Sequence, residues 1–347
     1  MSAKKIYQRL TTRWAVFTRF IKETKSNHQL VKDFLSLGLT KQDRFWLECL
    51  HFFLPARLKR LKIYRFIPHR LGGGMLTRSL GIDNKTLYAE LYQRMVSNPV
   101  IYKEGKLQLK DILLPSAVND KDVYTLMLVI LETLLPYLLE GEKISKDIAD
   151  SIHYVITEEF SYEFGHVTLN NGDTVIDAGA CMGDFAALAS VKGCKTYAFE
   201  PIPYVIENYL SKTVEWNKNI TICEYALSDD EGELEISFTD SLICGSSAHI
   251  KHGSDAEKIT VQKKTLDTFV HENNLQCVDF IKADIEGGER YMLQGAKNVL
   301  RDFAPKLAIC TYHLPDDPKV IRDLILDANP NYVIEGGTPK VYAHVPG

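Results

Sequence analysis

The sequence lacks the cysteine patterns of a disulfide-stabilised or zinc-bound protein. Its 347 residues include seven cysteines, none of which forms a C-x-x-C pair or clusters with histidine at zinc-ligand spacing. An odd, dispersed set indicates reduced thiols, so we expect neither a disulfide framework nor a structural metal site. The cysteines are Cys49, Cys181, Cys194, Cys223, Cys244, Cys277 and Cys310.

Long apolar runs are missing as well. The longest, VYTLMLVILETLLPYLL at 123–139, contains Glu132 and Pro136 and is too short for a membrane span. We therefore predict a buried helix there. No N-terminal apolar segment of the secretory type is present, which favours a cytoplasmic protein. The composition, 45% hydrophobic and 25% charged, is typical of a globular protein.

Acidic residues are scarce only at one end of the chain. Residues 1–70 contain 16 Lys and Arg but 4 Asp and Glu, a net charge of +12, whereas the rest of the chain carries −16. The basic part includes the aromatic stretch RLKRLKIYRF at 57–66. Such a segment suits an anionic acceptor or peripheral contact with an anionic membrane surface, but a solvated helical face explains it equally well. We expect no nucleic-acid partner, and the oligomeric state stays open.

The apolar spacing changes in period near residue 160. Over 1–160, apolar residues recur every three or four positions, which predicts a helical N-terminal region. Over 161–347, short β-rich runs alternate with helical stretches, which predicts a Rossmann-like α/β domain. The expected helices lie at 4–37, 41–54, 86–97, 122–140 and 144–158.

We predict a seven-stranded, mostly parallel sheet in the second domain. The last two strands are joined only by GGTP at 336–339, so we expect them to form an antiparallel C-terminal hairpin. Between the third and fourth strands, 232–238 and 258–263 form an insertion of alternating pattern. The expected strands are 174–180, 195–200, 220–226, 278–285, 306–312, 331–336 and 340–345, and the helices between them are 184–191, 203–214, 289–300 and 316–328.

The first predicted strand leads into a glycine loop, TVIDAGACMGD at 174–184. Gly179 and Gly183 permit a tight turn and close approach of a ligand to the backbone. Glu200 ends the next strand, 23 positions after Asp177, where a carboxylate can accept both hydroxyls of a ribose. Each feature alone has an ordinary structural explanation, but together they have the order and spacing of a nucleoside pocket.

A later strand end, DFIKADIEGGE at 279–289, carries several ionisable groups. Strand interiors seldom hold so many, so we expect most of them to face a cleft or a helix N-terminus. The glycine loop differs from the dinucleotide fingerprint G-x-G-x-x-G, because Cys181 and Ala186 stand where glycines would be needed. Its form, D-x-G-x-x-x-G, resembles class I S-adenosylmethionine-dependent methyltransferases instead.

The resemblance narrows to the FkbM family of these enzymes over about residues 165–345. Its most specific segments here are FIKADIEGGE and YHLPDDP; others are VIDAGACMGDFAAL, AFEPIP and ALSDDEG. The resemblance implies that S-adenosyl-L-methionine is the cofactor. It also implies that Asp284 stands near the sulfonium and the acceptor. The cofactor-binding residues that it implies are Asp177, Gly179, Ala180, Gly183, Glu200, Pro201, Ala226 and Asp284.

The expected reaction is in-line methyl transfer, most simply to a hydroxyl of a small molecule or glycan. Asp284 and His313 are then the two candidates for the base, because they follow neighbouring strands of the predicted sheet. Asp316 and Asp317 could hold a divalent cation together with Asp284 and Glu286, but helix capping explains Asp316 and Asp317 equally well, so we assign no metal ligands. A nicotinamide-dependent oxidoreductase and a non-catalytic cofactor-binding module remain as alternatives.

Overall fold

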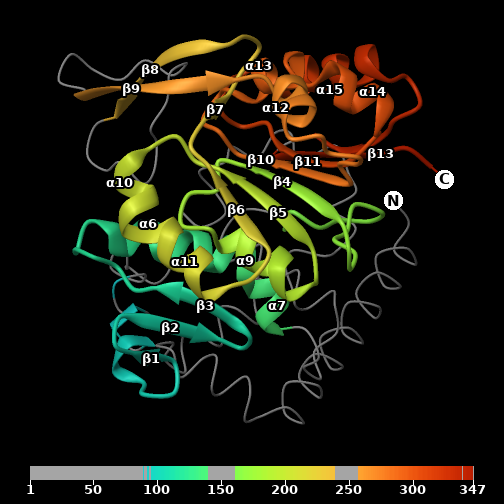
Figure 1. The fold of residues 1–347 in the computed structure, drawn as a ribbon. Coiled ribbons are helices and arrows are strands. Elements are labelled where there is room, and N and C mark those ends of the chain that lie inside the picture. The colour runs from blue at the N-terminus through green and yellow to red at the C-terminus, as the bar shows by residue number, and fades with distance from the viewer. Residues whose placement is uncertain are drawn as a thin grey trace, which may run out of the picture. The chain divides into compact units, whose positions relative to one another are not determined.

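The computed structural model describes residues 89, 92–93, 95–139, 161–238, 257–337 and 339–346 (Figure 1). The chain divides into two compact units, one made of 1–98 and 135–160 and the other of 99–134 and 161–347. The basic segment 1–70 and the helices expected at 4–37, 41–54 and 144–158 lie outside the described residues. Among the residues that are described, no helix is both long and apolar enough to cross a membrane.

A seven-stranded sheet forms the centre of the second unit, as the sequence predicted. Its order is β12-β13-β11-β10-β4-β5-β6. Neighbours from β11 to β6 are parallel, whereas β13 runs antiparallel to both β11 and β12. The terminal hairpin therefore lies at one edge of the sheet. The strands are β4 (Thr174–Ala178), β5 (Lys195–Phe199), β6 (Ile220–Cys223), β10 (Phe280–Ala283), β11 (Lys306–Cys310), β12 (Val333–Gly336) and β13 (Lys340–His344).

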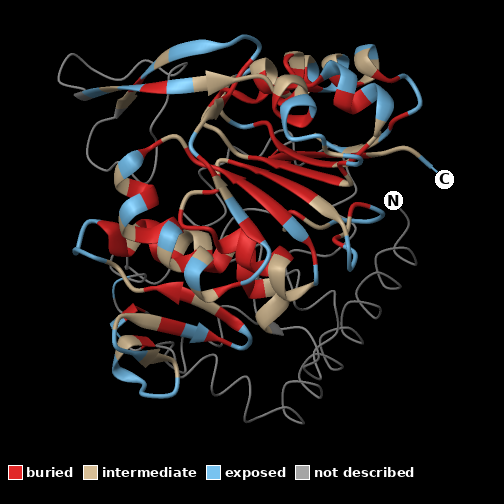
Figure 2. Ribbon diagram, viewed as in Figure 1, coloured by how far each residue is buried: buried red, intermediate tan, exposed pale blue. Residues whose placement is uncertain are grey.

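Helices cover both faces of this sheet (Figure 1). One face carries α9 (Asp184–Val191), α10 (Pro203–Val205), η4 (Ile206–Leu210) and α11 (Ser211–Trp216). The other carries α12 (Leu266–Glu272), α13 (Glu289–Gln294), α14 (Lys297–Asp302) and α15 (Asp317–Ala328). The central strands are buried on both faces, as Figure 2 shows, which explains their nearly continuous apolar sequence.

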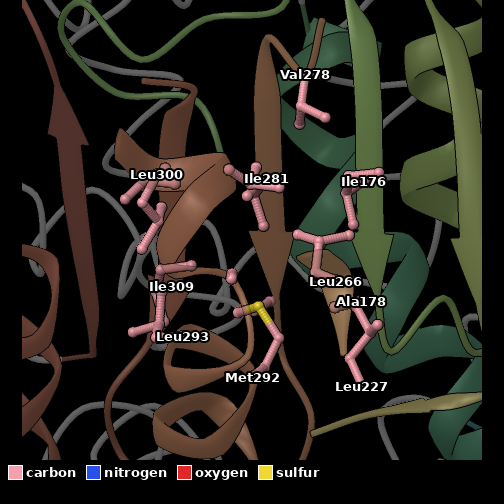
Figure 3. Packing of buried hydrophobic residues seen from close by; sticks show 14 of the residues in the cluster. Ile176, Ala178, Leu227, Leu266, Val278, Ile281, Met292, Leu293, Leu300 and Ile309 are labelled. Carbon is pink, nitrogen blue, oxygen red and sulfur yellow. The ribbon is translucent and has the colours of Figure 1, made fainter. Parts of the chain in front are cut away.

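Alternation along the strands divides the core into two clusters. Ile176 and Ala178 of β4 and Ile281 of β10 point to the same side and pack with Met292 and Leu293 of α13 (Figure 3). Residues between them in sequence point to the side of α9, because successive strand side chains alternate between faces. Asp177 of β4 and Lys282 of β10 thus face α9, and their positions decide much of the site described below.

The insertion forms a second, three-stranded sheet in the order β7-β9-β8. β8 (Gly232–Phe238) and β9 (Glu257–Lys264) are the two strands that the alternating pattern predicted, and they pair antiparallel. The strand expected over 220–226 is divided, because a turn in which Tyr225 N–H donates to Cys223 O separates β6 from β7 (Ala226–Leu227). Ala226 consequently pairs with β9 and not with the large sheet.

The expectation of an entirely helical region before residue 160 is wrong for residues 102–115. These residues form an antiparallel sheet of β1 (Tyr102–Lys103), β2 (Lys106–Leu109) and β3 (Ile112–Pro115). The turns between the strands place Glu104, Gly105 and Lys110 at positive φ, and only the glycine signals this in the sequence. This small sheet belongs to the same compact unit as residues 161–347.

The predicted helix over 122–140 is present, with a π-helical turn in its middle. It comprises α6 (Asp122–Val129), η3 (Ile130–Leu134) and α7 (Leu135–Leu139), the last belonging to the other compact unit. At the start of α6, Asp122 is buried and one of its oxygens accepts from the hydroxyls of Tyr209 and Tyr204, the latter at 3.0 Å. Asn217 of the large domain also bonds both the N–H and the C=O of Leu113, at 3.3 and 2.8 Å.

Candidate active site

Four predicted site residues lie at the carboxyl ends of neighbouring parallel strands. Asp177 lies in β4, Glu200 follows β5, Asp284 follows β10 and His313 follows β11 shortly after its end. Because these strands are parallel, their carboxyl ends share one edge of the sheet, where ligands of such sheets bind. Asp284 and His313 come together directly, with Nε2 of the histidine 3.5 Å from Oδ1 of the aspartate.

Asp177 and Lys282 form a buried ion pair beneath the glycine loop. They are opposite residues of adjacent parallel strands, and Nζ lies 3.1 Å from Oδ1. Nζ also donates to the carbonyl oxygens of Ala178 at 3.2 Å and Gly179 at 2.6 Å. Burial raises the pKa of Asp177 although Lys282 opposes the shift. Burial lowers the pKa of Lys282, but Asp177 and other carboxylates outweigh it and hold the ammonium charged.

This arrangement gives Asp177 a structural role beneath the glycine loop. Asp177 does not reach a ligand itself, because its side chain is completely buried. It fixes the ammonium of Lys282, which in turn fixes the backbone of the loop. Lys282 was not among the predicted site residues. Its register opposite Asp177 in two buried strands is the signal that could have identified it.

The two glycines of the loop face protein atoms. Gly179 has φ +75°, and a Cβ there would lie 2.0 Å from the carbonyl oxygen of Asp284. Gly183 has φ +83°, and a Cβ there would lie 2.8 Å from Cδ1 of Leu210. Both positions therefore require glycine for conformation and for packing. Their place beside the cofactor stays a prediction.

Glu200 connects the glycine loop to the end of β5. Its Oε2 accepts from the N–H of Cys181 at 3.0 Å, and its Oε1 accepts from the N–H of Ile202 at 3.0 Å. Burial raises the pKa of Glu200 to about 7, although these amide donors favour the carboxylate. Cys181 itself has φ +49°, an uncommon conformation for a residue with a side chain.

Ala180, Pro201 and Ala226 are three further residues that are predicted to bind the cofactor. Ala180 donates its N–H to Phe199 O at 2.9 Å, and its methyl group is buried in the apolar cluster on the side of α9. Pro201 is half-buried directly after Glu200, and Ala226 is half-buried in β7. Contact between these residues and a cofactor remains a prediction.

Asp284 accepts hydrogen bonds from two tyrosines. Tyr162 O–H donates to its Oδ2 at 2.7 Å, and Tyr312 O–H donates to its Oδ1 at 3.1 Å. Burial alone would raise the pKa of Asp284, but the charges of His313, Lys282 and Lys340 outweigh it and hold that pKa at about 2. Asp284 is thus a fixed, ionised acceptor at the end of β10.

His313 lies among three carboxylates. Its Nδ1 is 2.9 Å from Oε1 of Glu289, and its Nε2 is 3.4 Å from Oε2 of Glu286 as well as near Asp284. Burial lowers the pKa of the imidazole, but Glu289 and the other carboxylates outweigh this and raise it to about 9. Glu289 is held in turn by the backbone, because its oxygens accept from Ile285 N–H at 2.8 Å and Gly287 N–H at 3.0 Å.

Asp316 and Asp317 are partners of an arginine. Arg290 donates from its Nη2 to Oδ1 of Asp316 at 2.7 Å and from its Nε to Oδ1 of Asp317 at 3.1 Å. The second oxygen of Asp317 accepts from the N–H of Leu314 at 2.8 Å. These contacts connect α13 to the start of α15, so the two aspartates have a structural explanation other than cation binding.

Tyr162 is a site residue that no sequence motif indicated. Its ring is buried near the ammonium groups of Lys340 and Lys282, 4.6 and 5.3 Å from the ring centroid, and packs edge-on against Phe185 of α9. Burial first, and then the charge of Asp284, raise the pKa of Tyr162 well above its usual value, so the phenol remains a donor. Tyr162 is far from Asp284 in the sequence and comes next to it only through packing of the fold, so no local motif marks it.

Comparisons by sequence find similarity to methyltransferases. Residues 177–332 match the family described as the methyltransferase FkbM domain. Over 156 residues, 45% of this chain, the sequence is 27% identical to the hexuronic acid methyltransferase AglP of Haloferax volcanii. The match spans 62% of that relative, which is less than two thirds of its length.

Solved structures are similar at lower levels of sequence identity. The methyltransferase FkbM of Methylobacillus flagellatus is 18% identical with a TM-score of 0.41, over 79% of this chain and 60% of that one. The fibrillarin of Aeropyrum pernix, solved with natively bound S-adenosyl-L-methionine, is 16% identical with a TM-score of 0.31, over 50% of this chain and 67% of that one. Residues 177–332 of this chain, 156 of its 347 residues, are thus similar to the methyltransferase FkbM domain family.

Proposed function

We propose that this protein is an S-adenosylmethionine-dependent methyltransferase that methylates a hydroxyl of a glycan or small molecule. The observation that carries the proposal is the common sheet edge, where a glycine loop, Glu200 and the Asp284–His313 pair follow neighbouring parallel strands. The FkbM match over residues 177–332 supports the same activity. When bound, the cofactor would supply a methyl group already activated by the sulfonium.

The donor and acceptor groups present fit such a cofactor. Glu200 offers both carboxylate oxygens between the glycine loop and Ile202, and each oxygen retains a lone pair for a ribose hydroxyl. The backbone of residues 179–183 would border the methionine end, while Lys282 and Asp177 hold that loop from below. Ala226 would lie beside the adenine. Asp284, whose side chain is 19% exposed, would lie nearest to the reacting atoms.

In methyl transfer, the protein itself need not form a covalent bond to the acceptor or the methyl group. Aligning acceptor oxygen, methyl carbon and sulfur supplies most of the acceleration. As the acceptor oxygen bonds to carbon, its proton becomes strongly acidic and has to leave. Asp284 is the better of the two candidates for receiving it, because Tyr162 and Tyr312 fix its carboxylate at the strand end. His313 lies behind it among carboxylates.

For the acceptor, we propose a sugar that carries a carboxylate. The relative from Haloferax volcanii is named for a hexuronic acid. Independently, residues 1–70 have a net charge of +12, which would attract an anionic acceptor. We expect salt to weaken binding of a uronic-acid acceptor more than binding of its neutral sugar counterpart.

The test combines cofactor titration with turnover. We expect calorimetry to detect binding of S-adenosylhomocysteine but not of NAD, and labelled S-adenosylmethionine to transfer its methyl group to uronic-acid glycans. Asp284→Asn should retain product binding and lower transfer by roughly 10²–10⁴-fold, the usual contribution of a positioned proton acceptor. Glu207→Gln, an exposed position on η4, serves as the matched control. Binding of NAD alone would support an oxidoreductase; equal transfer by Asp284→Asn would remove the proton-acceptor assignment.

A further inference from the structure

The surroundings of His313 are unusual for a buried histidine. The imidazole is only 3% exposed, and three carboxylates approach its two nitrogens at 2.9 to 3.5 Å. Neither nitrogen makes a hydrogen bond of acceptable geometry with any of them. Buried polar groups are nearly always satisfied, and so many carboxylates around one ring call for a positive charge at the centre. A proton on the ring or a metal cation beside it would supply that charge.

The two sides of the ring differ in what they offer. On the Nδ1 side, both oxygens of Glu289 already accept backbone N–H groups, so this carboxylate is rigidly placed and completely buried. On the Nε2 side, Asp284 and Glu286 are 19% and 31% exposed. In metal-binding proteins, a carboxylate commonly lies next to one nitrogen of a histidine and orients the ring, while the other nitrogen binds the metal together with further ligands. His313 has this arrangement, with Glu289 at Nδ1 and partly exposed carboxylates at Nε2.

We propose that this cluster is a divalent-cation site, with Nε2 of His313, Asp284 and Glu286 as ligands and Glu289 fixing the ring from behind. Metal–ligand bonds of about 2.1 Å place neighbouring ligand atoms about 3.0 to 3.4 Å apart. Nε2 lies 3.5 Å from Asp284 Oδ1 and 3.4 Å from Glu286 Oε2. One oxygen each of Asp284 and Glu289 and one ring nitrogen also lie within 4.8 Å of one another, so the carboxylate behind the ring belongs to the same compact cluster as the proposed ligands.

The donor set favours a particular class of ion. Carboxylates suit Mg²⁺ and Mn²⁺, whereas imidazole favours first-row transition metals, so two carboxylates and one imidazole together favour Mn²⁺ over Mg²⁺. The site is distinct from Asp316 and Asp317, which are occupied by Arg290. It also does not depend on the proposed methyl transfer, because every ligand comes from the chain itself.

Mn²⁺ binding to the full chain without cofactor tests the proposal. Titration followed by the electron paramagnetic resonance signal of free Mn²⁺ should show one site, and the same ion should raise the midpoint of thermal unfolding. We expect His313→Ala and Asp284→Asn to weaken binding at least about 100-fold and Glu289→Gln to weaken it about 10- to 100-fold. Glu207→Gln should bind as the wild type does.

Two further variants keep the result interpretable. His313→Gln retains a polar side chain of similar reach, and should lose Mn²⁺ while keeping the metal-free unfolding midpoint close to that of the wild type. Glu286→Gln, at a partly exposed position, separates the Nε2 arrangement from binding at Nδ1. Absence of Mn²⁺ binding below millimolar concentration in the wild type would overturn the proposal. So would unchanged binding in His313→Gln, and unchanged binding in Glu286→Gln would overturn the ligand set.

Discussion

At the scale of single residues, the carboxylate of Glu200 combines a structural role with a proposed ligand-binding role. Its oxygens hold the backbone amides of Cys181 and Ile202, and the same oxygens are the proposed acceptors for ribose hydroxyls. Burial raises its pKa to about 7, so the side chain changes charge near neutral pH. Hydroxyl donors favour the ionised form, so a bound ribose would lower this pKa.

We expect the affinity for S-adenosylhomocysteine to rise about tenfold between pH 6 and pH 8, because ionised Glu200 goes from about a tenth to about nine tenths of the molecules. Stability should change in the opposite direction. The folded chain retains a proton that the unfolded chain releases near pH 4.5, so this contribution is complete below that pH and is lost as pH rises through about 7. Its size is about 3 kcal/mol.

Calorimetry and urea unfolding at pH 5, 6, 7 and 8 provide the measurement. Glu200→Gln should bind more weakly with a flatter pH profile, and its unfolding free energy should fall less between pH 5 and pH 8. Glu207→Gln should follow the wild type in both. A variant Glu200→Gln that keeps the wild-type pH profile would exclude this carboxylate as the titrating group.

At the scale of elements, the loop after β4 and the end of β10 are interlocked. The carbonyl of Asp284 occupies the place of the missing Cβ at Gly179, and Asp284 N–H donates to Ala178 O at 3.2 Å. Lys282 of β10 reaches across to the carbonyls of the same loop. The glycine loop and the proposed proton acceptor are therefore parts of one backbone arrangement.

Gly179→Ala should destabilise the fold by about 2 to 4 kcal/mol, because positive φ costs an alanine about 1 kcal/mol and overpacking adds about 1 to 3 kcal/mol. Gly172→Ala is the matched control, since Gly172 has φ +91° with no atom within 4 Å of the added Cβ. It should cost only about 1 kcal/mol. Equal unfolding free energies in urea for the two variants would show that the contact with Asp284 is relaxed without cost.

Elements with a strong local signal were predictable from sequence. Apolar runs predicted the strands of the large sheet, and the short connection GGTP predicted the terminal hairpin of β12 and β13. β1–β3 were missed because two of their turn residues, Glu104 and Lys110, adopt positive φ without being glycine. Of the candidate site, the positions of Glu200, Asp284 and His313 at neighbouring strand ends were predictable, whereas their roles remain predictions.

The partners of those site residues were not predictable. Tyr162 donates a hydrogen bond to Asp284, and the charge of Lys340 lowers the pKa of Asp284. Both residues come from segments far from Asp284 in the chain, and no local pattern marks them. The same holds for Arg290, which binds Asp316 and Asp317 across two helices. Register explains why Lys282 could have been identified, because an ionisable residue opposite a buried aspartate in a parallel sheet has one obvious partner.

At the scale of the whole molecule, residues 99–134 and 161–347 act as one compact unit. Their connection is partly polar. Asp122 at the start of α6 accepts hydrogen bonds from the hydroxyls of Tyr204 and Tyr209, and the oxygen of Tyr209 accepts from Val118 N–H at 2.9 Å. Tyr209 itself is completely buried. We therefore expect both parts to unfold in a single transition.

Tyr209→Phe should lower the unfolding free energy by about 1 to 3 kcal/mol, because it removes the acceptor of the Val118 N–H and one of the donors to the buried carboxylate of Asp122. Tyr102→Phe, at a half-buried position of β1, is the control and should change stability by less than about 0.5 kcal/mol. Denaturant unfolding followed by circular dichroism measures both. If Tyr209→Phe changed the unfolding free energy no more than Tyr102→Phe does, these hydrogen bonds would contribute nothing to the stability of the unit.

The bond from Tyr162 to Asp284 has a consequence for exchanging domains between relatives. The family match begins at residue 177 and ends at 332, yet Asp284 is held by a phenol at 162 and influenced by an ammonium at 340. A chimera joined at the limits of the matched sequence would contain Asp284, the proposed proton acceptor, but would take the residues at positions 162 and 340 from the other protein. A segment exchanged between relatives should therefore extend beyond residues 177–332, so that it includes Tyr162 and Lys340.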